Sequence, residues 1–234
     1  MFASFKQRSQ ELERLDTGDY TPREYAKWQR EMRFIHRVFG EMRALRNSLL
    51  REILESGEKE VSILDVGAGS GELLRELSKW LVEKKAFLVG AEINADATDA
   101  IRGENGGGAV TAILADARTL PFGNDSFDYV FCSLFLHHLD DKQAVTMLRE
   151  MGRVAMKKIF VIDLNRSPVA YYFYKLVGSL FLQRFTLEDG ALSILRSRLP
   201  GELRSLAVRA HLTDVSVQHS MANRLILSGQ NRER

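Results

Sequence analysis

The chain has 234 residues with a formal net charge of +2, and its composition is 45% apolar and 27% charged. These values are ordinary for a soluble globular protein with one sizeable core, so we expect one α/β domain with short additions. Basic and acidic side chains are interleaved, which argues against a nucleic-acid partner. The single cysteine, Cys132, excludes an intramolecular disulfide and suits a reducing compartment such as the cytoplasm.

No segment of the sequence has the pattern of a targeting or membrane-spanning element. Met1 to Leu12 is too polar for a secretory signal peptide. The longest apolar stretch, Val169 to Leu182, contains Lys175 and Gly178 and is too short to cross a bilayer. We therefore expect a cytoplasmic protein without stable membrane insertion.

Residues 1–60 are expected to form a helical N-terminal cap. Thr21-Pro22-Arg23-Glu24 has the form of a capping box with proline at the first helical position, which satisfies N–H groups at a helix start. The pattern that follows predicts two helices divided at Gly40, or one helix kinked there. Apolar residues recur in it at spacings of three and four: Tyr25, Trp28, Met32, Ile35, Phe39, Met42, Leu45 and Leu49.

Strands and helices alternate from Val61 onward, which predicts a core over residues 61–165, an aromatic lid or insertion over 166–200, and completion of the sheet over 201–234. The strands read as continuous apolar runs, typical of parallel strands covered on both faces. Right-handed crossovers then produce a doubly wound sheet that binds ligand at the carboxyl ends of its strands. The expected strands are Val61–Val66, Ala86–Glu92, Ala109–Ala115, Phe127–Ser133, Lys158–Leu164, Val215–His219 and Arg224–Ser228, and the expected helices are Ser70–Glu83, Ala95–Arg102, Asp140–Val154 and Pro200–Ala210.

A glycine-dense turn follows the first of these strands. Glycines let the backbone approach a ligand closely, and the N–H groups at the start of the next helix favour anionic groups. A nicotinamide-type fingerprint would have its third glycine at position 72, where this chain has Glu72. The spacing of Asp65, Gly67, Gly69 and Gly71 instead resembles motif I of the class I S-adenosylmethionine (SAM) methyltransferases.

That resemblance implies a Rossmann-like, mostly parallel sheet of seven strands with a C-terminal antiparallel hairpin, SAM as cofactor and S-adenosylhomocysteine (SAH) as product. It places Asp65, Gly67, Ala68, Gly69 and Gly71 at the cofactor.

Two acidic residues at strand ends extend the candidate cofactor site. Glu92 can accept hydrogen bonds from both ribose hydroxyls, with Ile93 beside it; the alternative is a solvated carboxylate at the strand end. Asp116 begins Asp-Ala-Arg-Thr-Leu-Pro-Phe, which resembles the D-A-x-x-L-P-F signature of small-molecule methyltransferases. By that resemblance Asp116 accepts the adenine amino group and the Ala117 N–H reaches the ring. An ordinary loop aspartate is the alternative.

The loop after the fourth strand supplies a candidate catalytic residue. Ser133 and the run His137-His138-Leu139 resemble the segment of type 11 methyltransferases that contacts the cofactor and borders the transfer site. His138 is a candidate base, because histidine titrates near neutral pH, and a base is needed only when the acceptor loses a proton. The alternative is that both histidines pack or cap the next helix.

The sequence lacks the residues that DNA methylation and metal-dependent methyl transfer require. The fourth strand is not followed by Asn/Asp-Pro-Pro-Tyr, and no Pro-Cys nucleophile occurs, so DNA amino and cytosine-C5 methylation are excluded. Asp163 and Asn165 are similar to the metal-binding pair of catechol methyltransferases, but Ser133 occupies the position of their expected partner. Histidine and cysteine show no zinc-ligand spacing. We expect no metal.

The acceptor is the least determined part. Pro168–Leu182 is rich in aromatic residues that suit an apolar acceptor, helix packing or a dimer face equally well, so a homodimer is compatible with the sequence. Arg33 and Arg37 are candidate partners for a carboxylate of SAM or of the acceptor.

A further resemblance refines the expected acceptor. Asp189-Gly190-x-x-Ser193-x-x-Arg196 is similar to a stretch in type 11 enzymes that accompany bacterial type III polyketide synthases. It implies O-methylation of a phenolic or otherwise hydroxylated, lipid-like small molecule. The alternatives are a quinone-precursor C-methyltransferase, a non-catalytic SAM-binding interaction protein and, disfavoured by Glu72, a dehydrogenase.

Overall fold

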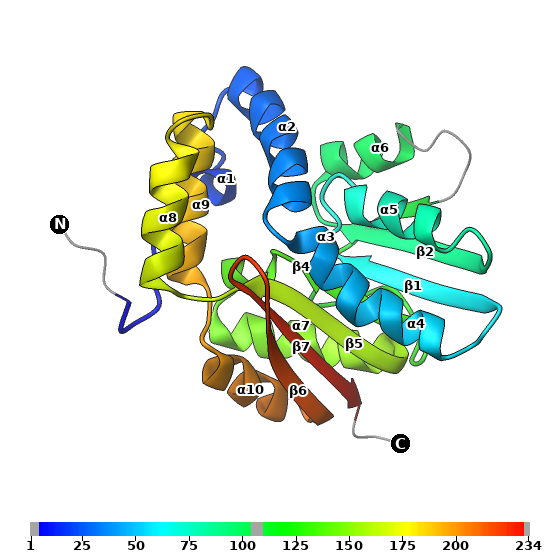
Figure 1. Cartoon of the computed structure of the whole chain (residues 1–234). Coiled ribbons are helices and arrows are strands. Elements are labelled where there is room, and N and C mark those ends of the chain that lie inside the picture. Colours follow the sequence, from blue (N-terminus) through cyan, green and yellow to red (C-terminus); the bar gives the residue numbers. More distant parts are fainter. Residues whose placement is uncertain (1–4, 104–109, 232–234) are drawn as a thin grey trace.

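The computed structural model describes residues 5–103 and 110–231, and a seven-stranded sheet in the order β3-β2-β1-β4-β5-β7-β6 lies at its centre (Figure 1). The strands from β1 to β5 pair in parallel, whereas β7 is antiparallel to both β5 and β6. This confirms the predicted parallel sheet with a C-terminal antiparallel hairpin. The strands are β1 (Glu60–Val66), β2 (Lys85–Glu92), β3 (Val110–Leu114), β4 (Phe127–Ser133), β5 (Ala155–Leu164), β6 (Leu212–Ser220) and β7 (Arg224–Asn231).

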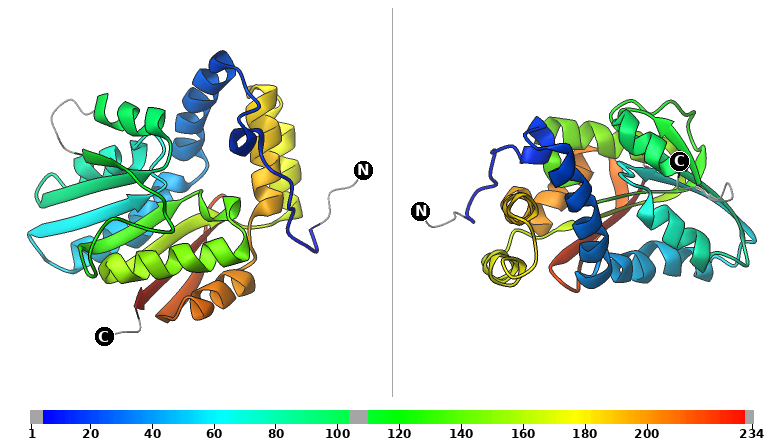
Figure 2. Two further views of the ribbon diagram at one scale, coloured as in Figure 1. Left: turned by 180° about the vertical axis from the view of Figure 1, so that it is seen from behind. Right: turned by 90° about the horizontal axis from the view of Figure 1, so that it is seen from above.

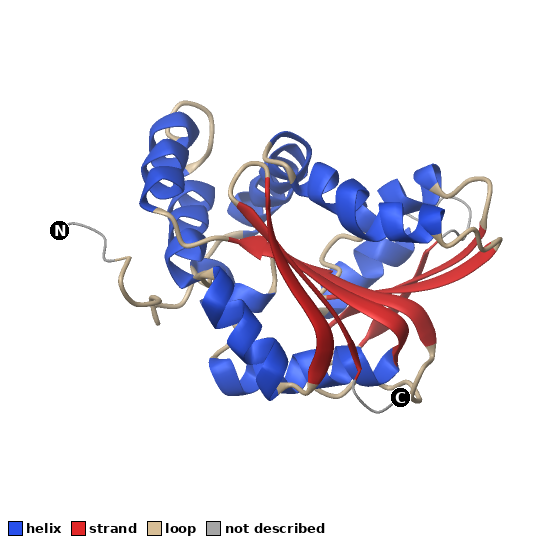
Figure 3. Ribbon diagram, turned by 60° about the horizontal axis from the view of Figure 1, so that its bottom comes forward, coloured by secondary structure: helices blue, strands red, loops and turns tan. Residues whose placement is uncertain are grey.

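Helices cover both faces of the sheet, which explains why its central parallel strands are largely apolar (Figure 3). One core lies between the sheet and the helices α7 (Asp141–Val154) and α10 (Pro200–Arg209), and it includes the fully buried Cys132. A second core packs on the other face. It involves α3 (Glu41–Leu45), the π-helical turn η1 (Arg46–Leu50), α4 (Arg51–Glu55), α5 (Glu72–Trp80) and α6 (Ala95–Gly103).

Four further helices lie beyond the carboxyl ends of the parallel strands: α1 (Arg14–Thr17), α2 (Pro22–Val38), α8 (Pro168–Gly178) and α9 (Arg184–Arg196). Figure 2 shows α8 and α9 side by side at the edge of the molecule, with α2 next to them. These helices form a wall around the end of the sheet at which doubly wound folds bind their ligands.

The predicted start of α2 and the break at Gly40 are both confirmed. The Thr21 hydroxyl accepts a hydrogen bond from the Glu24 N–H, and the Glu24 carboxylate accepts one from the Thr21 N–H. Gly40 has a φ of 83°, and a β-carbon there would lie 2.9 Å from the carbonyl oxygen of Met221. Glycine therefore lets the chain turn between α2 and α3 while it contacts the β6–β7 turn.

Several predicted boundaries differ from the structure. α5 begins at Glu72 rather than Ser70, because Gly71 has a φ of 72° and precedes the helix as its cap. β5 begins at Ala155 rather than Lys158, β6 and β7 are longer than predicted, and Ala109 lies outside the described residues. The segment 166–200 forms two helices, α8 and α9, where the sequence indicated only an aromatic insertion.

Among residues 5–103 and 110–231, no helix combines the length and apolar character needed to span a bilayer.

Candidate active site

The turn between β1 and α5 is built on glycines with positive φ. Gly67, Gly69 and Gly71 have φ values of 76°, 52° and 72°, a region that residues with a β-carbon rarely adopt. A β-carbon on Gly71 would meet Ile101 of α6 at 3.0 Å, whereas one on Gly69 would have no heavy atom within 4 Å. Gly67, Ala68 and Gly69 line a cavity, and Gly71 does not. Gly71 therefore closes the turn, and the other three face the cavity.

Glu92 lies beside this turn, because β1 and β2 pair in a register that places Val66 opposite Ala91. Its carboxylate accepts hydrogen bonds from the N–H groups of Gly69, Ile93 and Asn94 at 2.9, 2.8 and 3.0 Å. A carboxylate has about four lone-pair sites, so Glu92 retains acceptor capacity for a ligand hydroxyl. The structure thus joins the predicted ribose-binding residue to the glycine turn.

Two more carboxylates are buried next to the turn. Burial raises the pKa of Asp65 well above its usual range, and the neighbouring charges of Glu92 and Glu41 add to this effect. Glu72 is 6% exposed, and its oxygens have no hydrogen-bond partner among the described residues. His36 Nδ1 and Arg37 Nε, both from α2, lie 3.5 Å and 3.4 Å from the carboxylate oxygens of Glu72. The raised pKa favours the uncharged form of Asp65, and a positively charged ligand beside it would favour the ionised form.

Arg33 and Arg37, the predicted partners of a ligand carboxylate, have different surroundings in the structure. Arg33 lines the cavity. Arg37 is mostly exposed and pairs with Glu72.

Asp116 and Ala117 are not brought to the cavity, and neither residue is among those that line it. Asp116 instead binds Arg118, whose guanidinium donates to both carboxylate oxygens at 2.6–3.1 Å. These hydrogen bonds lower the pKa of Asp116. A role of Asp116 at an adenine ring would require the carboxylate to exchange Arg118 for the ligand.

Ser133 lines the cavity at the end of β4, as predicted. Its hydroxyl donates to Glu41 Oε1, and Arg224 Nε donates to Glu41 Oε2 at 2.7 Å. Glu41 and Arg224 are both buried, so this pair joins α3 to β7 beneath the cavity.

The two histidines have different surroundings. His137 is 3% exposed; its Nδ1 lies 2.7 Å from Asp163 Oδ1, and its backbone N–H donates to Oδ2. Burial opposes ionisation of Asp163, but the charge of His137 and its hydrogen bond outweigh burial and lower the pKa of Asp163. His138 lines the cavity, and its Nδ1 lies 2.7 Å from Asp16 Oδ1. His137 is thus buried and bound to Asp163, as the packing alternative predicts for that histidine, but it also lines the cavity, so its role stays a prediction.

Asp16 and Glu13, from α1 and its N-cap, complete the surroundings of His138. An ionised carboxylate only accepts hydrogen bonds, so Asp16 holds the proton of His138 on Nδ1 and leaves Nε2 directed at Glu13 Oε2, 4.0 Å away. Burial raises the pKa of Glu13 to about 7, although His138 and Arg196 lie close to it. Glu13 can therefore change protonation state near neutral pH.

Glu13, His137 and His138 are also the described residues that come closest to forming a metal site, with ligand atoms within 4.8 Å of one another. Nε2 of His137 lies 3.8 Å from Glu13 Oε1. Two ligands of a tetrahedral zinc ion at about 2.1 Å lie roughly 3.4 Å apart, so this cluster is wider than a filled site. The absence of a metal stays a prediction.

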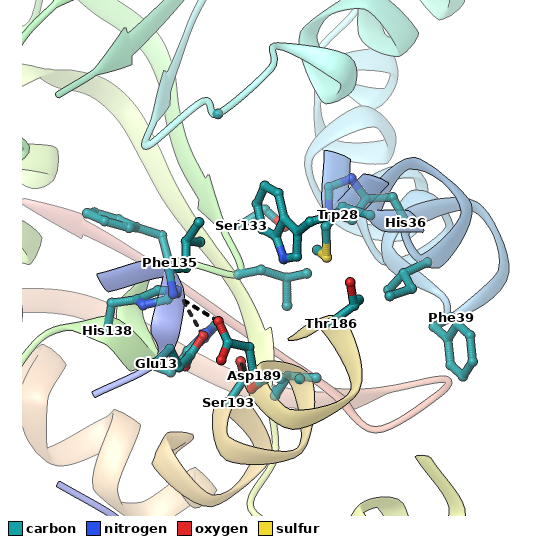
Figure 4. Close-up of a pocket in the computed structure, with 18 of the residues that line it drawn as sticks. Glu13, Trp28, His36, Phe39, Ser133, Phe135, His138, Thr186, Asp189 and Ser193 are labelled. Atoms are coloured by element: carbon teal, nitrogen blue, oxygen red, sulfur yellow. Dashed lines mark hydrogen bonds and ion pairs between the residues drawn. The ribbon is translucent and has the colours of Figure 1, made fainter. Parts of the chain in front are cut away.

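One cavity of about 660 Å³ connects these parts. Figure 4 shows His138, Glu13 and Ser193 on one side and Trp28, His36 and Phe39 of α2 on the other. The wall between them is largely aromatic: Tyr20, Tyr25, Trp28, Phe39, Phe135, Phe173 and Tyr174. Two aromatic side chains of the segment Pro168–Leu182, Phe173 and Tyr174, therefore line the cavity.

A family model described as a methyltransferase domain matches residues 63–158, which include the glycine turn, Glu92, Ser133 and His138. Residues 63–158 are a class I methyltransferase domain. The match ends before α8 and α9 and begins after α1 and α2, so the helices that form the wall lie outside the methyltransferase domain.

The chain is similar to other methyltransferases over part of its length. The chain is 32% identical over 138 residues to the ubiquinone/menaquinone biosynthesis C-methyltransferase UbiE of Hahella chejuensis, which covers 52% of this chain and 54% of that protein. It is 36% identical over 97 residues to the methyltransferase GfsG of Streptomyces halstedii, covering 39% of this chain and 33% of that protein. The chain thus spans about half the length of the first relative and a third of the second.

The fold of the methyltransferase domain and its additions is shared with solved structures. The plantazolicin methyltransferase BpumL, crystallised with a pentazolic desmethyl analogue and SAH, superposes with a TM-score of 0.65 at 16% identity, covering 86% of this chain and 90% of that chain. Identity this low supports the fold and not the substrate.

Sequence reasoning missed Glu13 and Asp16, because their partners are more than a hundred residues away. The sequence signal for this contact was the stretch Asp189-Gly190-x-x-Ser193-x-x-Arg196, whose named residues lie on one face of α9. Asp189 accepts the N–H groups of Arg14 and Leu15 at 3.0 and 2.9 Å, and so holds the start of α1.

Gly190 and Arg196 of the same stretch also fix how the surrounding segments pack. Gly190 leaves room for the Tyr174 ring. Arg196 binds Asp16 and donates to the carbonyl of His138 at 2.9 Å. The stretch thus positions the methyltransferase domain's His138 together with its partners.

Proposed function

We propose that this protein transfers a methyl group from SAM to a hydroxyl of a small, largely apolar acceptor of aromatic or lipid-like character. The continuity of the cavity supports this most: one space runs from the glycine turn and Glu92, past Ser133, to His138 and Glu13. Its aromatic side chains suit an apolar acceptor. The methyltransferase domain agrees with methyl transfer.

The residues at the turn fit SAM, which supplies a methyl group bound to a positively charged sulfur. Gly69 leaves open space for a ligand, Glu92 retains an acceptor site for a ribose hydroxyl, and buried carboxylates surround both. The residues of the proposed site that line the cavity are Asp65, Gly67, Ala68, Gly69, Glu92, Ile93 and Ser133. Asp116 and Ala117 stay predictions, because Arg118 holds Asp116 away from the cavity.

His138 is the proposed proton acceptor. Transfer of the methyl group would break its bond to the sulfur of SAM, which leaves SAH, and would form a C–O bond to the acceptor. His138 Nε2 can accept the hydroxyl proton because Asp16 keeps the imidazole's own proton on Nδ1. Glu13, with a pKa of about 7, has Oε2 4.0 Å from His138 Nε2, close enough for its ionised form to stabilise the imidazolium. The aromatic wall excludes water and orients the acceptor, which an in-line transfer requires.

The sequence relationship to UbiE supports one alternative, transfer to a ring carbon of a quinol-like acceptor. The same site can serve this reaction, since His138 can remove the proton of a phenolic hydroxyl and thereby make the ring carbon more nucleophilic. A non-catalytic SAM-binding protein is the third reading, and it predicts cofactor binding without turnover.

The test begins with calorimetric titration of SAH, with NADH as the control ligand. Micromolar binding of SAH alone is expected, and a preference for NADH would overturn the proposal. The protein is then incubated with SAM carrying a labelled methyl group and a panel of alkylated phenols and quinols, and the product is analysed by mass spectrometry and NMR. A labelled ether supports O-methylation, a labelled ring methyl supports the UbiE-like alternative, and binding without any labelled product supports the non-catalytic reading.

The role of His138 is tested by His138→Gln with His219→Gln as its control, because His219 is exposed on β6. Loss of a general base typically costs a factor of about 10² to 10⁴ in turnover. We expect such a loss with unchanged SAH affinity for His138→Gln and none for His219→Gln. Equal turnover of both variants would remove His138 from the reaction.

A further inference from the structure

The outer side of α8 presents an unusually apolar surface to solvent. Val169, Tyr172, Phe173 and Leu176 recur at spacings that place them on one side of α8, and Leu180 lies two residues beyond its end. All five side chains are between 50% and 82% exposed. Exposed single apolar residues are ordinary on a folded protein, but a continuous group of this size marks a site of interaction. We call these five residues the α8 face.

Helix α2 extends the α8 face with cations. Phe34 of α2 contacts Phe181 just beyond α8, with ring centroids 5.7 Å apart, and both side chains are exposed. Arg23, Lys27 and Arg30 are exposed on the same side of α2 as Phe34, because they precede it by eleven, seven and four residues. The surface therefore combines the apolar α8 face with a basic stripe on α2, formed by Arg23, Lys27 and Arg30.

The exposed charges of these helices have one sign. On α8 the exposed charged residue is Lys175. The acidic residues of α2, Glu24 and Glu31, are partly buried, and each contacts a cation, Arg14 and Lys27 respectively. Such a surface attracts an anionic partner with an apolar interior, which describes the headgroup and acyl boundary of an anionic bilayer.

The α8 face is continuous with the cavity. Val169 and Phe173 belong to both, since they are 79% and 56% exposed and also line the cavity. Figure 2 shows α8 at the edge of the molecule, away from the sheet. An apolar acceptor dissolved in a membrane would therefore reach the cavity along this helix without crossing water.

A second copy of this chain is a poorer occupant of the same surface. Two copies that meet through the α8 face would place the basic stripes of their α2 helices close together, and like charges across an interface oppose association. Negatively charged lipid headgroups meet the same cations with attraction.

We infer that the α8 face and the basic stripe of α2 dock this protein on the surface of anionic membranes and admit a lipid-like acceptor from the bilayer. The choice of acceptor rests on the proposed function, but the docking itself can be measured without turnover.

The experiment is co-sedimentation of the full chain with phosphatidylcholine vesicles that contain either no phosphatidylglycerol or roughly one third of it. We expect binding to the anionic vesicles, and weaker binding when NaCl is raised from about 0.1 M to about 1 M, because the Debye length falls from about 10 to about 3 Å. Leu176→Glu/Leu180→Glu should lower the partition coefficient at least about ten-fold, since it places charge in the apolar stripe. Arg30→Ala/Lys175→Ala should lower it by roughly five-fold for each cation removed.

Matched controls lie on α10, where Val208 is 62% exposed and Arg204 is also exposed. Val208→Glu and Arg204→Ala should leave the partition coefficient unchanged. Circular dichroism and SAH affinity should be unaltered in every variant, since none of the substituted residues lines the cavity.

Three outcomes would overturn the inference: no binding to anionic vesicles, equal effects of the α8 and α10 variants, or a stable dimer in light scattering that Leu176→Glu/Leu180→Glu dissociates. The last would assign the α8 face to a second copy of the chain. Vesicle binding without methyl transfer would refute the proposed function alone. Methyl transfer to a dispersed acceptor without vesicle binding would refute the docking alone.

Discussion

Replacing Glu13 by glutamine is expected to stabilise the folded protein at alkaline pH. The side chain is 3% exposed, and burial raises its pKa from 4.5 to about 7 despite the nearby His138 and Arg196. Between these two pH values the unfolded chain has released the proton while the folded chain retains it. The free energy of unfolding therefore falls as the pH rises from about 4.5 to 7, and the full cost persists at higher pH.

The pKa values of Glu13 in the unfolded and folded chain set the size of this change in the free energy of unfolding. At 1.36 kcal/mol for each pKa unit, their difference corresponds to about 3 kcal/mol. Glutamine resembles the protonated carboxyl in shape and carries no charge, so Glu13→Gln avoids this cost. The variant should be about 2–3 kcal/mol more stable than the parent at pH 8, and the gain should vanish below pH 4.5.

Urea unfolding at pH 8, 6 and 4.5 measures this difference, with Glu11→Gln as the control because Glu11 is exposed two residues earlier. The control should change stability by less than about 0.5 kcal/mol at each pH. Equal or lower stability of Glu13→Gln at pH 8, or a gain that does not depend on pH, would refute the assignment of Glu13 as a buried carboxyl that takes up a proton on folding.

Three further predictions concern the cavity and its wall. Gly69→Val should abolish SAH binding measured by calorimetry, because a β-branched residue strains a φ of 52° and fills the open side of the turn; retained affinity would contradict the glycine-turn site. Glu92→Ala should weaken SAH binding by about 1–3 kcal/mol through lost charge-assisted hydrogen bonds, and unchanged affinity in a folded variant would remove Glu92 from the site. Gly190→Ala should lower the free energy of unfolding by about 1–2 kcal/mol, because its β-carbon would lie 2.5 Å from Cζ of Tyr174, whereas Gly201→Ala, with open space around it, should not. Equal stability of the two alanine variants would show that α8 and α9 adjust freely.

Local patterns predicted the core of this protein well, because each of them depends on neighbours in the chain. The capping box at Thr21, the break at Gly40 and the strand Phe127–Ser133 are confirmed at the predicted residues. The glycine turn and Glu92 were placed together from the rule that parallel strands meet at one edge of the sheet, and the hydrogen bond from the Gly69 N–H to Glu92 confirms it.

The surroundings of His138 depend on contacts that no local pattern encodes. Whether His138 is a base or a packing residue was undecidable from the loop alone, since the answer depends on Asp16 and Glu13, which approach from the N-terminal cap. The predicted contact of Asp116 with the adenine ring was also undecidable from the local pattern. Its carboxylate accepts a hydrogen bond from the side chain of Arg118, two residues along the chain, and this bond competes with a ligand for the same oxygen.

The sequence by itself determined the sheet, the turn and the chemistry that residues 63–158 carry, because hydrophobic periodicity and glycine conformations act over a few residues. Only the tertiary structure decided which side chains share the cavity. Asp189 and Arg196 of α9 hold α1 against the loop that carries His138, and this arrangement raises the pKa of Glu13 by burial. Burial is a property of packed elements, so it appears when distant segments meet and not before.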